Sequence, residues 1–263
     1  MNVLAVETSG AQIGLAAVQV TAQVTAQVTA TTQGASAQTR AVLASAQPRQ
    51  LSRHIITLIE GTLQQAGWGH DDVDVLSVGL GPGSWTGLRI GLTTAKTLAQ
   101  VRGWKLAGVP TFDAVAQAVW RNVFEGVDAS APQLPEHFLL LVTAPCRPGE
   151  VYGKIYECHP EYLAVAQAEW IGSPRLIGGT LGAEALARDI QARFVLAGEA
   201  ADMVGAALGS TEEYSVLPLS AEAVAVEVAS VGALAVANGA TADPLALQPL
   251  YLAPSAAERN RRE

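Results

Sequence analysis

A glycine-rich turn is the first place where this sequence could do chemistry. The turn reads GPGSWTGLRIG from Gly81 to Gly91 and follows an apolar run that ends at Leu80. Free N–H groups at the start of the next predicted helix, near Ser84, could hold an anion because they carry partial positive charge. The turn nevertheless fails both phosphate-binding patterns. No glycine precedes Lys-Ser or Lys-Thr, and Thr86 stands where a dinucleotide fingerprint needs its third glycine.

Small side chains recur every four residues on the helix predicted after this turn. Gly87, Gly91, Ala95 and Ala99 fall on one helix face, which favours the close approach of a second helix. We therefore expect this helix to form an interface with a partner protein. Two alternatives stay open, namely an anion site at the helix start and purely internal packing. The residues expected at the interface are Ser84, Trp85, Gly87, Leu88, Gly91 and Ala95.

The end of the first predicted strand carries a second group of polar residues. Glu7, Thr8 and Ser9 follow the apolar run NVLAV, and an acid at a strand end of an α/β fold can hold a metal-bound phosphate. The alternative for Glu7 is a capping or surface role. Together with Gly81 and Gly83, these residues form the candidate anion or nucleotide site. No base accompanies the hydroxyls and no GxSxG turn occurs, so no catalytic residue is predicted.

Histidine and cysteine spacing gives no metal-binding pattern. No HxxxH or HExxH pair arises from the four histidines, His54, His70, His137 and His159. The two cysteines, Cys146 and Cys158, form no CxxC pair and are too few for a disulfide framework. The sequence therefore predicts no metal site and two reduced thiols, as expected of a cytoplasmic protein.

Composition disfavours a free-standing nucleic-acid binder. The chain has 263 residues, a formal net charge of -8 and 49% hydrophobic residues. Phosphate contacts dominate nucleic-acid affinity and call for a basic surface, so a partner would supply most of any such contact. No basic leader precedes the first apolar run, and no segment is typical of a membrane span. We expect a soluble, cytoplasmic protein.

Alternating strand and helix patterns predict an α/β fold. The repeat QVTAQVTAQVTA at Gln19–Ala30 has the period-2 pattern of a half-buried strand, although a low-complexity insert is the alternative. A first domain is expected over residues 1–109, a second and smaller one over 110–217, and a C-terminal helix and tail over 218–263. Strands are predicted at 2–9, 12–20, 72–80, 105–109, 137–144, 150–158, 162–170 and 193–200, and helices at 49–69, 85–102, 110–120, 183–191 and 220–238.

Five segments resemble the bacterial TsaB (YeaZ) family. They are LAVETS at 4–9, SVGLGPGSWTGLRIGLTTAK at 77–96, LAGVPTFDAVA at 106–116, GEVYGKIYE at 149–157 and PLYLAP at 249–254. The resemblance implies a two-domain fold of the actin/sugar-kinase/Hsp70 type with a reduced second domain. It also implies a non-catalytic subunit that supports threonylcarbamoylation of adenosine 37 in tRNAs reading codons that begin with A.

The same resemblance implies particular partners. They are the catalytic paralogue TsaD, the ATPase TsaE and, when the protein is alone, a second copy of the chain. The tRNA would be held mainly through the complex. No cofactor is expected to bind firmly, with ATP or ADP held only where subunits meet.

Three positions depart from the family pattern. Glu7 stands where the family usually has Asp, Leu51 where it often has His, and Thr143-Ala144-Pro145 where it usually has Asp-Ala-Arg. These departures weaken an ATP-hydrolysing role and leave the scaffold interpretation intact.

Two other functions compete with the scaffold. One is a small-molecule kinase of the same superfamily, which would need a DxG turn where this chain has Glu7-Thr8-Ser9. The other is a metallopeptidase, against which the missing HxxxH pair argues.

Overall fold

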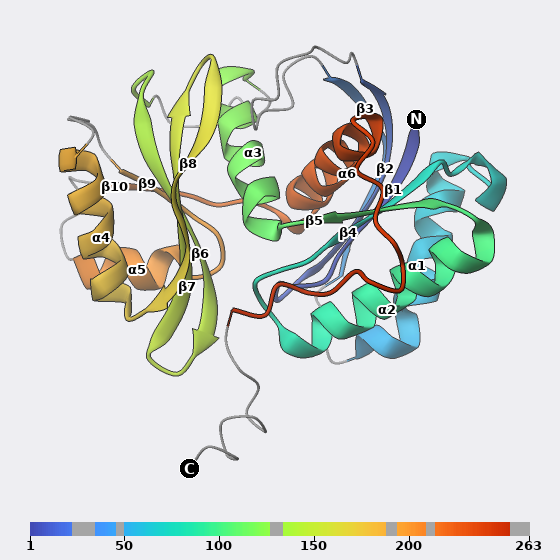
Figure 1. Cartoon of the computed structure of the whole chain (residues 1–263), viewed down its shortest axis with the longest axis horizontal. Helices are drawn as coiled ribbons and strands as arrows, with labels where there is room; N and C mark the ends of the chain where they lie inside the picture. The colour runs from blue at the N-terminus through green and yellow to red at the C-terminus, as the bar shows by residue number, and fades with distance from the viewer. Residues whose placement is uncertain (23–34, 46–49, 127–133, 188–193, 209–213, 253–263) are drawn as a thin grey trace.

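A computed structural model gives the fold of the chain. It describes residues 1–22, 35–45, 50–126, 134–187, 194–208 and 214–252. The chain forms two lobes, each built on a five-stranded sheet, with two helices between the sheets (Figure 1). The predicted α/β class is confirmed.

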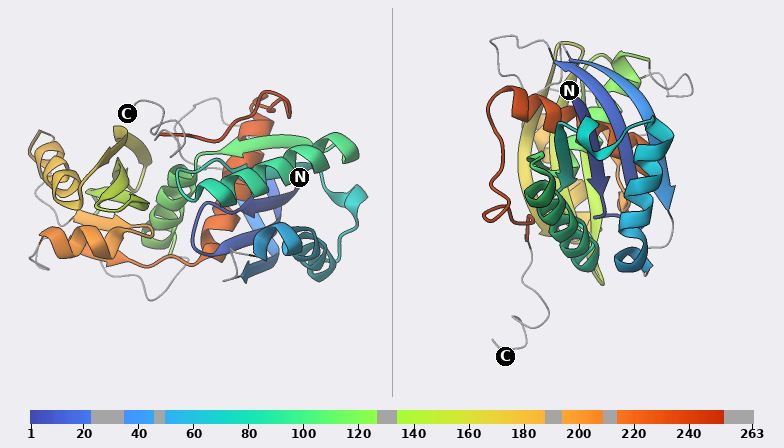
Figure 2. Two further views of the ribbon diagram at one scale, coloured as in Figure 1. Left: turned by 90° about the horizontal axis from the view of Figure 1, so that it is seen from below. Right: turned by 90° about the vertical axis from the view of Figure 1, so that its right-hand side faces the viewer.

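The first sheet has the strand order β3-β2-β1-β4-β5. β1 pairs antiparallel with β2 and parallel with β4, so it lies at the centre of the sheet. Both faces of the sheet are covered, by α1 and α2 on one side and α6 on the other (Figures 1 and 2). The elements are β1 (Asn2–Glu7), β2 (Ile13–Ala22), β3 (Ala35–Ser45), β4 (Val75–Gly79), β5 (Lys105–Val109), α1 (Leu51–Ala66), α2 (Trp85–Arg102) and α6 (Ala221–Ala237).

Alternate side chains of β1 pack against the helices on opposite faces of the sheet. Leu4 and Val6 pack toward α1 and α2, whereas Val3 and Ala5 pack toward α6. Successive side chains of a strand point to opposite faces, so a strand covered on both faces is a nearly continuous apolar run.

The second sheet repeats the topology of the first. Its order is β10-β9-β6-β7-β8, and β6 pairs antiparallel with β7 and parallel with β9. α4 and α5 cover one face and α3 the other, and α4 and α5 are shorter than α1 and α2. The elements are β6 (Phe138–Arg147), β7 (Glu150–His159), β8 (Tyr162–Gly172), β9 (Phe194–Ala197), β10 (Tyr214–Leu217), α3 (Thr111–Phe124), α4 (Pro174–Ala187) and α5 (Ala201–Leu208).

α3 and α6 pack against each other between the sheets. Arg121 on α3 donates from Nη1 to Oε1 of Glu227 on α6 at 2.8 Å. Glu227 is only 4% exposed, and burial raises the pKa of its carboxyl against the lowering effect of Arg121. The first sheet ends at Val109 and the second at Leu217. The division into domains at residues 109 and 217 stays a prediction.

Most predicted elements lie where the sequence pattern put them, with a few differences. α2 has the predicted bounds, with Ser84 accepting from the Gly87 N–H at 3.2 Å and Gly103 at a φ of 71°. α4 begins at Pro174, earlier than the predicted residue 183, since Pro suits a first helical turn. β3, β10 and α5 were not predicted. Residues 23–30 of the Gln19–Ala30 repeat lie outside the described residues.

Close packing of α6 on β4 predicts a cost for one added methyl group. A Cβ at Gly232 would lie 2.0 Å from Oγ of Ser77, so Gly232→Ala should lower the free energy of unfolding by about 1–3 kcal/mol. Gly61→Ala on α1 is the matched control, because nothing lies within 4 Å of its added Cβ. It should raise stability by about 0.5–1 kcal/mol. Urea unfolding of both variants measures the contrast, and equal stabilities would contradict the packing described.

Candidate functional site at the interlobe cleft and helix α2

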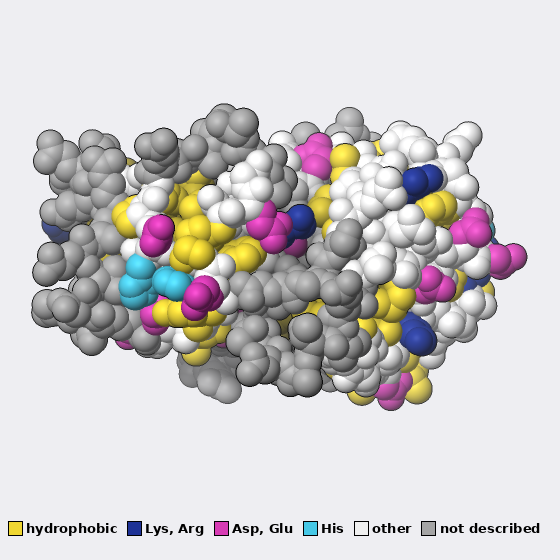
Figure 3. All heavy atoms as spheres, turned by 90° about the horizontal axis from the view of Figure 1, so that it is seen from above, with side chains coloured by type: hydrophobic (Ala, Val, Ile, Leu, Met, Phe, Trp, Pro, Cys, Tyr) yellow, Lys and Arg dark blue, Asp and Glu magenta, His cyan; other side chains and the backbone are white. Residues whose placement is uncertain are grey.

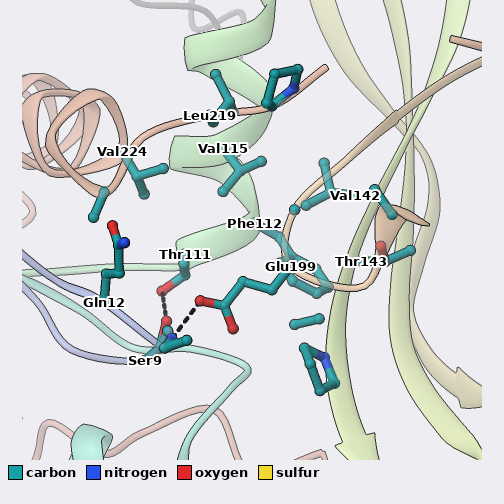
Figure 4. A pocket seen from close by; sticks show the side chains of 18 of the residues that line it. Ser9, Gln12, Thr111, Phe112, Val115, Val142, Thr143, Glu199, Leu219 and Val224 are labelled. Atoms are coloured by element: carbon teal, nitrogen blue, oxygen red, sulfur yellow. Dashed lines mark hydrogen bonds between the residues drawn. The ribbon is translucent and has the colours of Figure 1, made fainter. Parts of the chain in front are cut away.

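A pocket of about 600 Å³ lies between the two lobes. Figure 4 shows that Ser9 and Gln12 of the first lobe and Thr143 and Glu199 of the second approach it from different sides. Its apolar wall comes mainly from α3, β6 and the segment before α6. The apolar lining residues include Phe112, Val115, Val142, Ala144, Pro145, Val216, Leu217, Leu219 and Val224.

Glu7 closes the floor of this pocket and is 4% exposed. Its Oε1 accepts from the Ser9 N–H at 2.6 Å, and its Oε2 accepts from Oγ1 of Thr111 at 2.8 Å. Burial raises the pKa of Glu7 even though these hydrogen bonds lower it. Glu7 is therefore not a surface residue, and it caps the turn that follows β1. The anion or nucleotide role of Glu7, Thr8, Ser9, Gly81 and Gly83 stays a prediction.

The glycines after β4 let α2 sit directly on the end of β1. A Cβ at Gly87 would lie 2.0 Å from the carbonyl oxygen of Thr8, and one at Gly91 would lie 2.1 Å from Oγ1 of Thr8. Thr8 also donates from Oγ1 to the Gly87 carbonyl at 2.9 Å. At Gly83, a Cβ would lie 2.3 Å from the Ser9 carbonyl. The turn is thus shaped by contact with residues 8 and 9.

This geometry corrects part of the predicted interface. Gly87, Leu88, Gly91 and Ala95 are buried in the core of the first lobe, because the small residues make room for the strand end and not for a partner helix. Of the residues expected at the interface, the exposed Ser84 and the half-buried Trp85 stay accessible. An interface on α2 stays a prediction.

The accessible side of α1 and α2 carries apolar side chains of its own. Ile56 on α1 is 48% exposed and Val101 on α2 is 74% exposed, and α1 and α2 pack against each other. Sequence periodicity could have found this outward side, because these residues interrupt the polar face of each helix.

Three carboxylates and no Lys or Arg occur among the described residues that line the pocket. The acids are Glu7, Glu199 and Asp202. Glu199 accepts a hydrogen bond from the Ala11 N–H across the cleft, so it ties the second lobe to the β1–β2 turn. Thr143 is one of the three positions at which the sequence departs from the family pattern. It is buried and donates to the Ala197 carbonyl at 3.3 Å. The cleft is thus negatively charged.

A C-terminal strap (residues 242–252) runs beside α2 and β5 (Figure 1). Its Ala242 N–H donates to the Leu106 carbonyl at 2.8 Å, and its Leu250 N–H donates to the Leu80 carbonyl at 2.9 Å. Lys96 Nζ on α2 donates to the Leu247 carbonyl at 3.0 Å. The strap therefore holds one side of α2.

An aromatic and cationic stack joins the strap to the start of α2. The rings of Trp85 and Tyr251 lie 4.1 Å apart between centroids, and the Arg89 guanidinium lies 4.4 Å from the Trp85 ring centroid. Arg89 Nε also donates to the Tyr251 hydroxyl at 3.3 Å. Arg89 and Tyr251 were not predicted as site residues, because 162 positions separate them and no local pattern links them.

A third group of polar side chains lies on the far lobe. Figure 3 shows histidines beside carboxylates on one face. The rings of His137 and His159 are 6.0 Å apart, and His137 Nε2 lies 2.9 Å from Oε1 of Glu157. In the part of the chain that the structure describes, no group of three or more His, Cys, Asp or Glu is placed to hold a metal ion.

The sequence matches a known family model over most of its length. The model describes TsaD, tRNA N6-adenosine threonylcarbamoyltransferase, and it matches residues 23–248. The chain belongs to this family. None of the described helices is long and apolar enough to span a membrane.

Curated relatives point to the TsaB branch. The chain is 36% identical over 75 residues to the tRNA threonylcarbamoyladenosine biosynthesis protein TsaB of Escherichia coli, which covers 28% of this chain and 32% of that protein. It is 34% identical over 86 residues to TsaB of Haemophilus influenzae, covering 31% and 36%. The chain thus spans about a third of the length of the curated relatives it matches.

Solved structures support the fold. YeaZ from Pseudomonas aeruginosa matches with a TM-score of 0.69 at 19% identity, covering 95% of this chain and 99% of that one. An uncharacterised protein from P. aeruginosa similar to peptidase YeaZ matches with a TM-score of 0.69 at 20% identity, covering 96% and 99%. Membership of the TsaB (YeaZ) family and an α/β fold with two sheets, both predicted from the sequence, are confirmed.

Burial of Glu7 predicts a pH dependence of stability. Because burial raises the folded-state pKa of Glu7 above its ordinary value of 4.5, folding takes up a proton in the pH range between the two values. The contribution of Glu7 to stability should therefore fall as pH rises above about 4.5 toward the folded-state pKa. Glu7→Gln removes this titration, so the stability of the variant relative to wild type should rise with pH across the same window.

Urea unfolding from acid to neutral pH measures that difference for Glu7→Gln. The exposed Glu136→Gln is the matched control, because water solvates this carboxylate. A relative stability of Glu7→Gln that stays flat with pH would contradict the buried position of Glu7.

Proposed function

We propose that this protein is a non-catalytic scaffold subunit of the complex that adds threonylcarbamoyl to adenosine 37 of tRNAs reading codons that begin with A. It acts by pairing with a TsaD homologue through the outer side of α1 and α2. Family membership supports the pathway. The observation that carries the pairing is the exposure of Ile56 and Val101 on the helical layer of the first lobe, because accessible apolar side chains gain from burial against a partner.

The charge of the cleft supports the non-catalytic role. A nucleoside triphosphate placed there would meet the carboxylates of Glu199 and Asp202, with no Lys or Arg from the described lining residues. Like charges at close range oppose binding, more strongly where the surroundings exclude water. Glu7 is already engaged by Ser9 and Thr111. ATP or ADP is therefore proposed to bind only where subunits meet.

Other partners follow from the same proposal. The ATPase TsaE joins the complex of the two paralogues, and the chain alone forms a homodimer through the same helical layer. The tRNA is held mainly by the complex, in keeping with a net charge of -8.

Substitutions on the exposed helices should break the pairing while the fold stays intact. Ile56→Glu and Val101→Glu each place a charge on an exposed site, so the affinity for the TsaD homologue of the same organism should fall about tenfold or more. Leu176→Glu on α4, where Leu176 is 60% exposed, is the matched control and should pair normally. Light scattering of co-purified proteins gives the result.

A wild-type chain that forms no heterodimer would overturn the pairing, as would full pairing by both variants. Gly87→Trp is unsuitable as a test, because its side chain would collide with the Thr8 carbonyl inside the chain. Deletion of the gene should remove threonylcarbamoyladenosine from tRNA, and unchanged modification would reject the pathway assignment.

The isolated chain should show no tight binding of Mg-ATP in titration calorimetry, because of its acidic cleft. Stoichiometric, tight binding would favour the kinase alternative. Glu199→Lys supplies a cation at the pocket and should strengthen any weak ATP binding, whereas Glu136→Lys, exposed and outside the pocket, should not.

A further inference from the structure

α2 and the first residue of β5 form a basic stretch in an otherwise acidic protein. Residues 85–105 contain Arg89, Lys96, Arg102 and Lys105 and no Asp or Glu, whereas the whole chain has a net charge of -8. The strap beside them contains a single acid, Asp243. On the strap side the positive charge comes from Arg89 and Lys96, which both donate hydrogen bonds to the strap.

None of these four cations has a carboxylate partner among the described residues. Arg89, Arg102 and Lys105 are exposed, and Lys96 is half-buried with a backbone carbonyl as its acceptor. Arg121 and Lys154, in contrast, form ion pairs with Glu227 and Asp113. These four cations can thus neutralise the charge of a partner.

The aromatic stack at the start of α2 places a flat surface beside these cations. The rings of Trp85 and Tyr251 pack against each other. The Arg89 guanidinium lies over the Trp85 ring and donates a hydrogen bond to the Tyr251 hydroxyl. Tyr251 is 41% exposed, so part of its surface is open to contact. A side chain that is already ordered loses little rotational freedom on binding.

Arg89 and Lys96 are seven residues apart, which places them on one side of the helix. Both contact the strap. Ile56, in contrast, lies on the neighbouring helix α1.

We propose that Trp85, Arg89, Lys96 and Tyr251 form a contact surface for single-stranded RNA. A base stacks on the exposed part of Tyr251, and Arg89 and Lys96 neutralise the neighbouring phosphates. Aromatic rings and arginine planes are the usual platforms for unpaired bases. The inference rests on the proposed function, in which tRNA is the substrate of the complex, and it gives this subunit a direct share in holding that tRNA.

An acidic protein partner is the competing occupant. Cations alone would suit both occupants, but the ordered aromatic stack favours a flat ligand such as a base. For RNA, each lost phosphate contact on a single strand should lower the slope of log affinity against log salt by about 0.7.

The test measures binding of an unmodified tRNA transcript, by fluorescence anisotropy, to the full chain alone and to its complex with the TsaD homologue. Tyr251→Ala and Arg89→Ala should each weaken RNA binding by about tenfold, and Arg89→Ala should lower the salt slope by about 0.7. Tyr251→Phe keeps the ring and should keep most of the affinity. Light scattering should show normal pairing with the TsaD homologue in every variant.

Two control variants match the tests in chemistry. Leu245→Ala removes a 77% exposed side chain of the same strap, and Arg175→Ala removes an exposed arginine of α4. Both should bind RNA within about twofold of wild type, since neither touches the stack.

Unchanged RNA affinity and slope in Tyr251→Ala and Arg89→Ala would overturn the proposal. Loss of pairing with the TsaD homologue in these variants, at unchanged RNA affinity, would also overturn it and would mark the surface as a protein contact. If the wild type fails to pair with the TsaD homologue, the proposed function fails, while RNA binding by the chain alone still decides this inference.

Discussion

The close approach of α2 to the end of β1 is the constraint on which the rest of the site depends. Thr8 occupies the space that side chains at Gly87 and Gly91 would need, and its hydroxyl donates a hydrogen bond to the Gly87 carbonyl. This contact sets the direction in which α2 leaves the sheet. It thereby places the start of α2 beside the strap.

A second contact at the end of β1, made by the hydroxyl group of Thr111, fixes the floor of the cleft. Thr111 donates to Glu7 and accepts from the Gly81 N–H at 3.1 Å. The first residue of α3 is thus tied to the end of β1 and to the turn after β4. Because α3 also packs on the second sheet, the position of one lobe relative to the other is set at this junction. Glu199 adds a second tie from the opposite lobe.

Sequence patterns predicted the elements well where the signal is local. The bounds of α2 followed from Ser84 and Gly103, whose capping chemistry acts within one turn. The role of the small-residue stripe could not be predicted, because spacing shows that something approaches closely but not what it is. Here the neighbour is the backbone of Thr8, far away in sequence. The Arg89–Tyr251 contact and the cleft likewise arise from long-range packing, for which a single sequence carries no signal.

The repeated topology has a consequence for how the chain holds together. Each sheet is covered on its inner face by one of two helices that pack on each other, α3 and α6. α6, although it follows the second sheet in sequence, covers Val3, Ala5 and Val75 of the first. Removing the second half of the chain would therefore uncover the core of the first half. The two lobes are thermodynamically linked, and heating should melt them in one cooperative transition, not two.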